Sequence, residues 1–226
     1  MLRLAFAPGS SRDEALARQV VEDVSAPERG VLPEGKVYVE SPMGALVRDL
    51  LFNDGWQSDE PWTLLRRDLR APVPDPGVRV DVIGPEQAHE WAAVHRASFD
   101  GSTFTDERWH AMAAGTPYVD ARCLVARNEQ GEAVAAVTVW SAGEGKPGLI
   151  EPMGVHRTHR GHGYGRAITL AAARALRELG SSSVDVGTPS SNVAAVATYR
   201  SAGLEQLPER RDLYRSGTPA CARPAP

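Results

Sequence analysis

Glycines crowd residues 155–165, VHRTHRGHGYG, which lie between an apolar run and a helical pattern. The apolar run at 148–155 predicts a strand, and the spacing of apolar residues over 166–179 predicts an amphipathic helix. Glycines at such a junction let backbone N–H groups turn outward and approach a ligand closely. The unpaired first-turn N–H groups and the positive dipole end of the helix reinforce this effect. The stretch therefore predicts an anion-binding turn, most often for a phosphate.

The order of the glycines distinguishes between phosphate motifs. Gly161-x-Gly163-x-Gly165 departs from the dinucleotide fingerprint G-x-G-x-x-G, and the chain has no Gly-Lys-Ser or Gly-Lys-Thr of a P-loop. The hexapeptide RGHGYG at 160–165 matches R-x-x-G-x-G at every defined position. It resembles the acyl-CoA pyrophosphate signature of the GCN5-related N-acetyltransferases. The alternative at this motif is an ordinary glycine-rich turn between a strand and a helix.

A second block downstream strengthens the resemblance. Residues 183–187 predict a short strand, and an alanine-rich helix follows. The segment is similar to the family's N-x-x-A-x-x-x-Y-x-x-x-G-F block, with Leu204 where Phe is usual. The matching positions are Asn192, Ala195, Tyr199 and Gly203. The resemblance covers residues 78–216, about the size of one domain.

The predicted order of elements over 78–216 is strand, two helices, three strands, helix, strand, helix and strand. This order resembles the family fold, which is of the α+β class: a mixed, mainly antiparallel central sheet with helices on both sides. We expect residues 78–216 to form the catalytic domain. The proline-rich segment 71–77 is expected to be a stiff linker, and the Pro- and Ala-rich tail 217–226 is expected to be disordered.

Residues 1–70 predict a smaller unit with two helices and several strands. The run 45–56 looks like a faded copy of 195–204, with Leu51 at the position of Tyr199, and residues 7–12 cannot supply R-x-x-G-x-G. We interpret the unit as a truncated, degenerate half of a GCN5-related N-acetyltransferase (GNAT) domain, as in tandem members of the family. The alternative is an unrelated α+β appendage. A half-domain leaves a sheet edge open, so we expect docking on the second domain or homodimerisation through this unit.

Bulk properties narrow the functional classes. The net charge of −4 gives no electrostatic reason to expect nucleic acid as a partner. No apolar run reaches the ~20 residues that a membrane span needs, so we expect no membrane partner. The two cysteines, Cys123 and Cys221, do not make a disulfide framework, which fits a reducing, cytoplasmic location.

The resemblance implies roles for individual residues. Tyr199 would be the acid that protonates the leaving sulfur, and Val155 would donate its backbone N–H to the thioester carbonyl oxygen. Asn192 would hold the cofactor or a water, or would simply cap its helix. Arg160 would shape the loop, whose N–H groups would bind the pyrophosphate. The implied cofactor-binding residues are Met153, Val155, Arg160, Gly161, His162, Gly163, Tyr164, Gly165, Arg166 and Asn192.

Glu151 is the candidate general base. Strand alternation places Glu151, Met153 and Val155 on one face, so Glu151 would line the same cleft as the thioester. A water could take the role instead, and Glu151 would then be a carboxylate paired with an arginine. The three histidines of the junction lie in a turn without a carboxylate cluster, so we expect no metal.

These observations predict an acetyl-CoA-dependent N-acetyltransferase that acts on a primary amine of a small molecule by direct attack in a ternary complex. Two alternatives remain: a catalytically idle acyl-CoA-binding or scaffold module, and an acetyltransferase for protein N-termini or lysines. Acceptor-binding residues are expected from the least patterned segments, 97–105 and 141–148.

Overall fold

The computed structural model describes residues 1–216, and its contacts divide the chain into two compact units. Within the described residues, the smaller unit comprises 1–62, 189–191 and 209–216; the larger unit comprises 63–188 and 192–208. The expected disordered tail, 217–226, lies outside the described residues.

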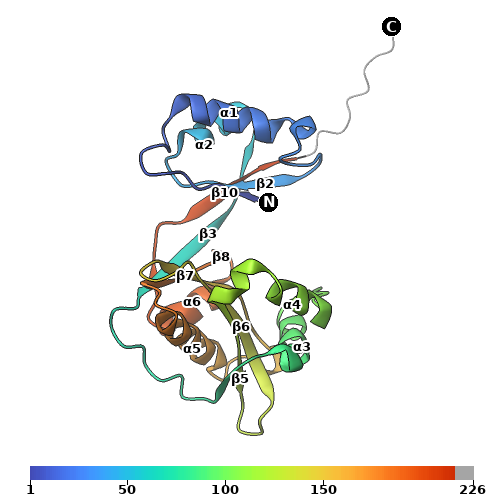
Figure 1. The fold of residues 1–226 in the computed structure, drawn as a ribbon, viewed down its shortest axis with the longest axis vertical. Coiled ribbons are helices and arrows are strands. Elements are labelled where there is room, and N and C mark those ends of the chain that lie inside the picture. Colours follow the sequence, from blue (N-terminus) through green and yellow to red (C-terminus); the bar gives the residue numbers. More distant parts are fainter. Residues whose placement is uncertain (217–226) are drawn as a thin grey trace. The chain divides into compact units, whose positions relative to one another are not determined.

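As far as the structure describes it, the smaller unit is a four-stranded sheet with two α-helices. Its elements are β1 (Leu2–Arg3), α1 (Glu14–Ser25), β2 (Val37–Glu40), α2 (Leu46–Asn53), the first half of β3 (Gln57–Asp68) and β10 (Arg210–Arg215), with a short 3-10 helix, η1, at Pro27–Arg29. The strand order is β1-β2-β10-β3, with β1 and β2 parallel and β10 antiparallel to both neighbours. Figure 1 shows α1 and α2 on one face of this sheet, where Val37, Val39 and Leu213 form a core with both helices.

The larger unit is a mixed sheet flanked by helices on both faces. Its strands are the second half of β3, β4 (Val80–Val82), β5 (Ala121–Arg127), β6 (Ala133–Ser141), β7 (Pro147–Val155), β8 (Ser183–Pro189) and β9 (Glu205–Gln206). Its helices are α3 (Ala88–Ser98), α4 (Asp106–Ala113), α5 (Tyr164–Glu178) and α6 (Val193–Ser201), with 3-10 helices η2 (Pro85–Gln87), η3 (Thr116–Asp120) and η4 (Arg157–His159). The order is β3-β8-β7-β6-β5-β4, and β9 pairs with β3.

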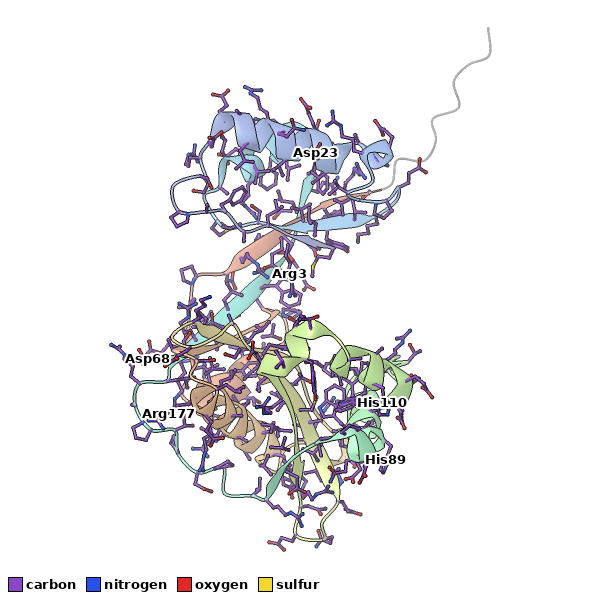
Figure 2. All side chains as sticks on the ribbon, in the orientation of Figure 1. Arg3, Asp23, Asp68, His89, His110 and Arg177 are labelled. Carbon is purple, nitrogen blue, oxygen red and sulfur yellow. The ribbon has the colours of Figure 1, made fainter. Side chains whose placement is uncertain are left out.

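Neighbouring strands from β4 to β7 are antiparallel, whereas β7 and β8 are parallel. The expected fold class, a mainly antiparallel sheet between helices, is therefore confirmed. Figure 1 shows α5 and α6 on one side of this sheet and α3 and α4 on the other. In Figure 2, His89 and His110 mark the α3–α4 side and Arg177 marks the α5 side.

Each face of the larger sheet has its own core. Alternate residues of β6 point to opposite faces, so Val137 and Val139 pack with α5 residues such as Ile168, while Ala136 packs with Trp91 of α3. This burial on both faces explains why β5 and β6 are nearly continuous apolar runs rather than alternating ones.

Two boundaries differ from those drawn on the sequence. The division between the units falls within β3, between Trp62 and Thr63, and the proline-rich segment 71–77 lies inside the larger unit. There Asp75 pairs with Arg174 of α5 at 2.9 Å. The terminal strand β10 belongs to the smaller unit because it pairs with β2 and with the first half of β3. A strand's partner depends on long-range pairing, which its own sequence does not specify.

None of the helices within residues 1–216 combines the length and apolar character required to span a bilayer.

Candidate active site

Strand β7 carries a bulge at its centre. The register of the β6–β7 ladder shifts between Val137 and Val139, whose partners are Met153 and Ile150. Two β7 residues, 151–152, therefore oppose a single residue of β6, which defines a β-bulge. The second of the two is a proline, which has no N–H to give to the ladder. Bulges of this kind re-aim side chains next to active sites.

The bulge changes the face on which Glu151 lies. Ile150 and Met153 share a face because their partners on β6 do, and Glu151 follows Ile150 on the strand, so it lies on the opposite face. The expectation that Glu151 shares a face with Met153 and Val155 is therefore wrong, because the bulge absorbs one residue of the alternation. Glu151 is exposed, and its carbonyl oxygen accepts a hydrogen bond from Trp140 Nε1 at 2.7 Å.

The parallel strands β7 and β8 separate at the same point. Their residue pairs run from Pro147–Ser183 to Leu149–Asp185. Within the described residues no later pair joins them, although β7 continues to Val155 and β8 to Pro189. The second half of β7 therefore has a ladder partner only on its β6 side. We call this region the β7–β8 split.

Backbone N–H groups of β7 point into the split. His156 N–H donates to Val134 O at 2.9 Å, which identifies this position as a hydrogen-bonded pair with β6. In an antiparallel ladder the hydrogen-bonded and non-hydrogen-bonded pairs alternate. Val155 and Met153 occupy the non-hydrogen-bonded positions, so their N–H groups turn away from β6 and toward the split. The N–H group of Val155, the residue expected to act as the donor, therefore points into the split.

The loop after β7 depends on two glycines for its conformation. Gly161 has φ +82° and Gly163 has φ +83°, in the left-handed region that side chains other than glycine rarely adopt. A β-carbon at either position would meet no heavy atom within 4 Å. The glycines are therefore required by the backbone turn, and the space beside each of them is open.

The first turn of α5 presents free donors beside this loop. Gly163 is the N-cap and has no side chain to cap the helix, and the first intrahelical bond runs from Ala167 N–H to Gly163 O at 3.0 Å. The N–H groups of Tyr164, Gly165 and Arg166 come before that bond and have no partner within the helix. Residues 156–166 also contain three arginines and three histidines but no acid. The charge and the donors both favour an anion.

Gly165 brings three elements together. A β-carbon at this position would lie 2.9 Å from Thr198 Cγ2 of α6 and 3.5 Å from Val155 Cγ2. The start of α5, the end of β7 and the middle of α6 therefore approach one another closely at this glycine. The helix that carries Tyr199 is placed against the strand that carries the inward N–H groups.

Arg160 supports the loop from outside the split. Its Nη2 donates to Ser98 O, at the last residue of α3, at 2.8 Å. The side chain thus ties the loop to the C-terminal end of a helix, where a cation is favoured by the unpaired carbonyls and the dipole. This position suits the shaping role expected for Arg160.

Tyr199 is buried in the core between the sheet and α5. It is 5% exposed and belongs to the cluster against which Met153, Val155 and Tyr164 pack. Burial raises the pKa of the Tyr199 phenol to about 12. Tyr199 is therefore uncharged and carries its proton throughout the neutral range.

Asn192 caps α6. Its side-chain oxygen accepts a hydrogen bond from Ala195 N–H at 3.2 Å, and the residue is exposed. The capping alternative from the sequence analysis is thus satisfied in the geometry. An amide that caps a helix keeps its NH₂ group for another partner, so a cofactor role for Asn192 stands as a separate proposal.

The histidines of the loop make contacts with one another and with the backbone. His156 Nδ1 lies 2.8 Å from Thr158 Oγ1, and His162 Nδ1 lies 2.9 Å from Arg160 O. Burial, followed by the neighbouring charges, lowers the pKa of His156. Within residues 1–216 no group of three or more His, Cys, Asp or Glu side chains is placed to hold a metal ion.

Sequence reasoning missed the residues that fix these elements from the neighbouring helices. Ser98 lies so close to Gly154 that a β-carbon there would be 2.4 Å from Ser98 Cβ, and Thr198 limits position 165 in the same way. Neither residue belongs to a motif, and each matters only because of what packs beside it. The signal available in the sequence was the glycine on the opposite side of each contact.

A parallel strand pair that splits, with a glycine loop and a helix N-terminus at the split, defines the acetyltransferase-fold class. Comparison with known proteins agrees with this class. A model of the acetyltransferase (GNAT) family matches residues 87–204, more than half of the 226 residues. The chain belongs to the acetyltransferase (GNAT) family.

Individual curated relatives share about 30% sequence identity with the chain. The mycothiol acetyltransferase of Propionibacterium freudenreichii subsp. shermanii is 30% identical over 155 residues, which cover 62% of this chain and 49% of that protein. The chain spans about half the length of the curated relatives it matches.

Solved structures agree in fold. A GCN5-related N-acetyltransferase from Sphaerobacter thermophilus has a TM-score of 0.69 at 20% identity, covering 93% of this chain and 71% of that one. A tandem GNAT protein from the clavulanic acid biosynthesis pathway has a TM-score of 0.67 at 18% identity, covering 96% and 75%. At these identities the likeness establishes the fold alone.

Proposed function

We propose that the protein is an acetyl-CoA-dependent N-acetyltransferase that acetylates a primary amine of a small molecule by direct attack in a ternary complex. The observation that carries the proposal is the direction of the Met153 and Val155 N–H groups. They point into the β7–β8 split, next to the α5 N-terminus and to the core that contains Tyr199. Family membership supports the same reaction class.

The residues of the loop fit the diphosphate of coenzyme A. Gly161 and Gly163 leave open space at the turn, and a side chain at either position would be strained. The donors assigned to the diphosphate are the backbone N–H groups of Gly161, His162, Gly163, Tyr164, Gly165 and Arg166. Acetyl-CoA supplies the activated acetyl group, and the protein positions the reactants and transfers the protons.

The reaction forms a C–N bond and breaks the C–S bond of the thioester. The acceptor amine, which is protonated at neutral pH, must first lose a proton. Glu151 is proposed to accept that proton, directly or through a water, from the face of β7 opposite to the Val155 side chain. Val155 N–H donates to the carbonyl oxygen as negative charge develops there. Tyr199 gives its proton to the departing sulfur, and it regains a proton from the nitrogen, which loses its second proton as the amide forms.

Burial prepares Tyr199 for this role. A phenol with a pKa of about 12 holds its proton at every pH at which the enzyme would be assayed. It is thus present in the acid form at the start of each turnover. Asn192, at the start of the same helix, is assigned to hold the cofactor or a water through its amide NH₂ group, which capping leaves available.

The acceptor is proposed to be a small molecule rather than a protein. The curated relatives carry the name mycothiol acetyltransferase, so the amine that such enzymes acetylate is one member of a test panel. Protein N-termini and lysine peptides form a second arm of the panel. Turnover with peptides alone would replace the small-molecule assignment.

We also propose that the smaller unit is a degenerate GNAT-like half. Its parallel β1–β2 pair is followed by α2, as the β7–β8 pair is followed by α6. Trp56 N–H donates to Leu51 O at 3.0 Å, and Leu204 N–H donates to Tyr199 O at 3.2 Å, each next to a glycine with positive φ. Leu51 thus stands where Tyr199 stands, without a hydroxyl.

The loop of the smaller unit is occupied by its own chain. Ser11 O accepts a hydrogen bond from Leu46 N–H at 2.9 Å, and Arg12 Nη1 donates to Gly44 O at 3.0 Å. These contacts support binding of one coenzyme A per chain. The edge strand β1 supports homodimerisation through this unit as a further proposal, which sizing by light scattering would test.

Two measurements test the proposed enzyme. Calorimetry with coenzyme A should give saturable heat at one site per chain. Titration of free thiol in mixtures of protein, acetyl-CoA and the amine panel should give amine-dependent release. Saturable binding without release across the panel would identify an idle acyl-CoA-binding module instead, and absence of binding would overturn the assignment entirely.

A further inference from the structure

The C-terminal end of α3 is tied to the loop by two arginines. Arg157 Nε donates to Ala97 O at 2.9 Å, and Arg160 Nη2 donates to Ser98 O at 2.8 Å. Both carbonyls belong to the last turn of α3, whose final carbonyls have no partner within the helix. Arg157 also lies 3.3 Å from Asp100 through its Nη2.

The same turn of α3 contacts β7 at the edge of the split. A β-carbon on Gly154 would be 2.4 Å from Ser98 Cβ and 3.1 Å from Phe99 Cε2. There is no room between the strand and the helix end for either to shift without the other. The end of α3 is therefore held both by the backbone next to Val155 and by the arginines of the loop.

The segment 99–105, which connects α3 to α4, follows directly after this turn. Ser102 Oγ lies 3.0 Å from His95 Nδ1, and Arg96 Nη1 donates to Phe104 O at 2.9 Å. The Phe104 ring packs at 4.8 Å from the His95 ring. The segment is thus fixed to α3 at several points, and α3 is fixed to the loop.

We propose that Arg157 is a positioning residue that couples the coenzyme A loop to segment 99–105, which is part of the stretch 97–105 expected to supply acceptor-binding residues. The inference rests on the proposed function, because it needs coenzyme A to bind at residues 161–166. Binding fixes the loop, Arg157 transmits that constraint to the last turn of α3, and segment 99–105 is held more firmly in the arrangement that its contacts with α3 define. A ligand orders a distant segment only through contacts that favour one arrangement; Arg157 supplies them here.

Hydrogen exchange of the whole protein, with and without coenzyme A, tests the coupling. In the wild type we expect coenzyme A to slow amide exchange over 97–105 by about fivefold or more. Arg157→Ala should bind coenzyme A with affinity close to wild type and lose most of that protection. Arg157→Lys should recover part of it, since one ammonium can reach Ala97 O but cannot also span to Asp100.

Two further variants distinguish the link through Arg157 from a general effect of removing an arginine. Arg174→Ala removes a half-exposed arginine that pairs with Asp75 in the same unit, and it should leave the protection at 97–105 unchanged. Asp100→Asn removes the charge of the carboxylate that pairs with Arg157. The Asp100 side chain is 98% exposed, so this variant tests the ion pair without a risk to folding. It should reduce the protection in part.

The outcomes separate the two proposals. Unchanged protection in Arg157→Ala and Asp100→Asn, or no protection in a wild type that binds coenzyme A, would overturn the coupling and leave the enzyme assignment intact. No calorimetric binding by the wild type would overturn the proposed function and the coupling with it. With an amine identified from the panel, Arg157→Ala should also raise KM for the amine and not KM for acetyl-CoA.

Discussion

Gly165 and Thr198 stand so close that any side chain at 165 would collide with the neighbouring helix. A β-carbon there would lie 2.9 Å from Thr198 Cγ2, a separation that real β-carbons do not adopt. The third glycine of residues 160–165 therefore has a different role from the first two. Gly161 and Gly163 serve the backbone turn, whereas Gly165 allows α5 and α6 to approach.

This contact predicts the effect of adding one methyl group. Gly165→Ala should lower the free energy of unfolding by about 1–3 kcal/mol through overpacking, although the higher helix propensity of alanine offsets part of the loss. Thr198→Ser removes the Cγ2 atom that would clash. In the double variant we expect denaturant unfolding to recover at least half of the loss, and purely additive effects would contradict the proposed contact.

The phenol of Tyr199 should matter for turnover and not for binding. Tyr199→Phe keeps the buried ring and removes the acid, so kcat should fall by about 10²-fold. Coenzyme A affinity by calorimetry should stay within about twofold of wild type, since the ring still fills the same space. Tyr214→Phe, on β10 of the smaller unit, is the matched control and should keep full activity. Undiminished kcat in Tyr199→Phe would remove the phenol from the mechanism.

Glu151 should contribute to the removal of a proton from the acceptor amine. Glu151→Gln cannot accept a proton, so kcat/KM should fall by about 10²-fold. Glu129→Gln, in the exposed turn between β5 and β6, is the control. A kcat/KM equal to that of the wild type in Glu151→Gln would mean that solvent water takes the proton without help from Glu151.

His95 should make the larger unit less stable in acid. Burial, followed by the charge of Arg96, lowers the pKa of His95 below its ordinary value of about 6.5. Between the folded and the unfolded pKa the unfolded state binds more protons, so stability falls as pH decreases below about 6.5. The loss levels off once the pH is below the folded pKa.

Comparison of two histidines on α3 measures this effect. His95→Gln should show a smaller drop in Tm between pH 7 and pH 5 than the wild type. His89→Gln, at an exposed position of the same helix (Figure 2), should behave like the wild type. Direct titration of the His95 ring by NMR gives the folded pKa, and a value at or above 6.5 would contradict the expected sign.

The sequence alone determined the strand, loop and helix around 155–165 and the block from Asn192 to Tyr199. These signals are local: glycines with positive φ, a capping side chain and apolar spacing act within a few residues of the chain. The fold class and the family followed from them.

Only the tertiary structure decided which face Glu151 occupies, which unit β10 joins and which helix the loop arginines hold. A bulge shifts the alternation by one residue, and it exists only against a partner strand. Strand pairing, the approach of Thr198 to Gly165 and the contact of Arg157 with Ala97 join residues distant in sequence. Long-range packing sets these relationships, and no local pattern encodes the identity of the partner.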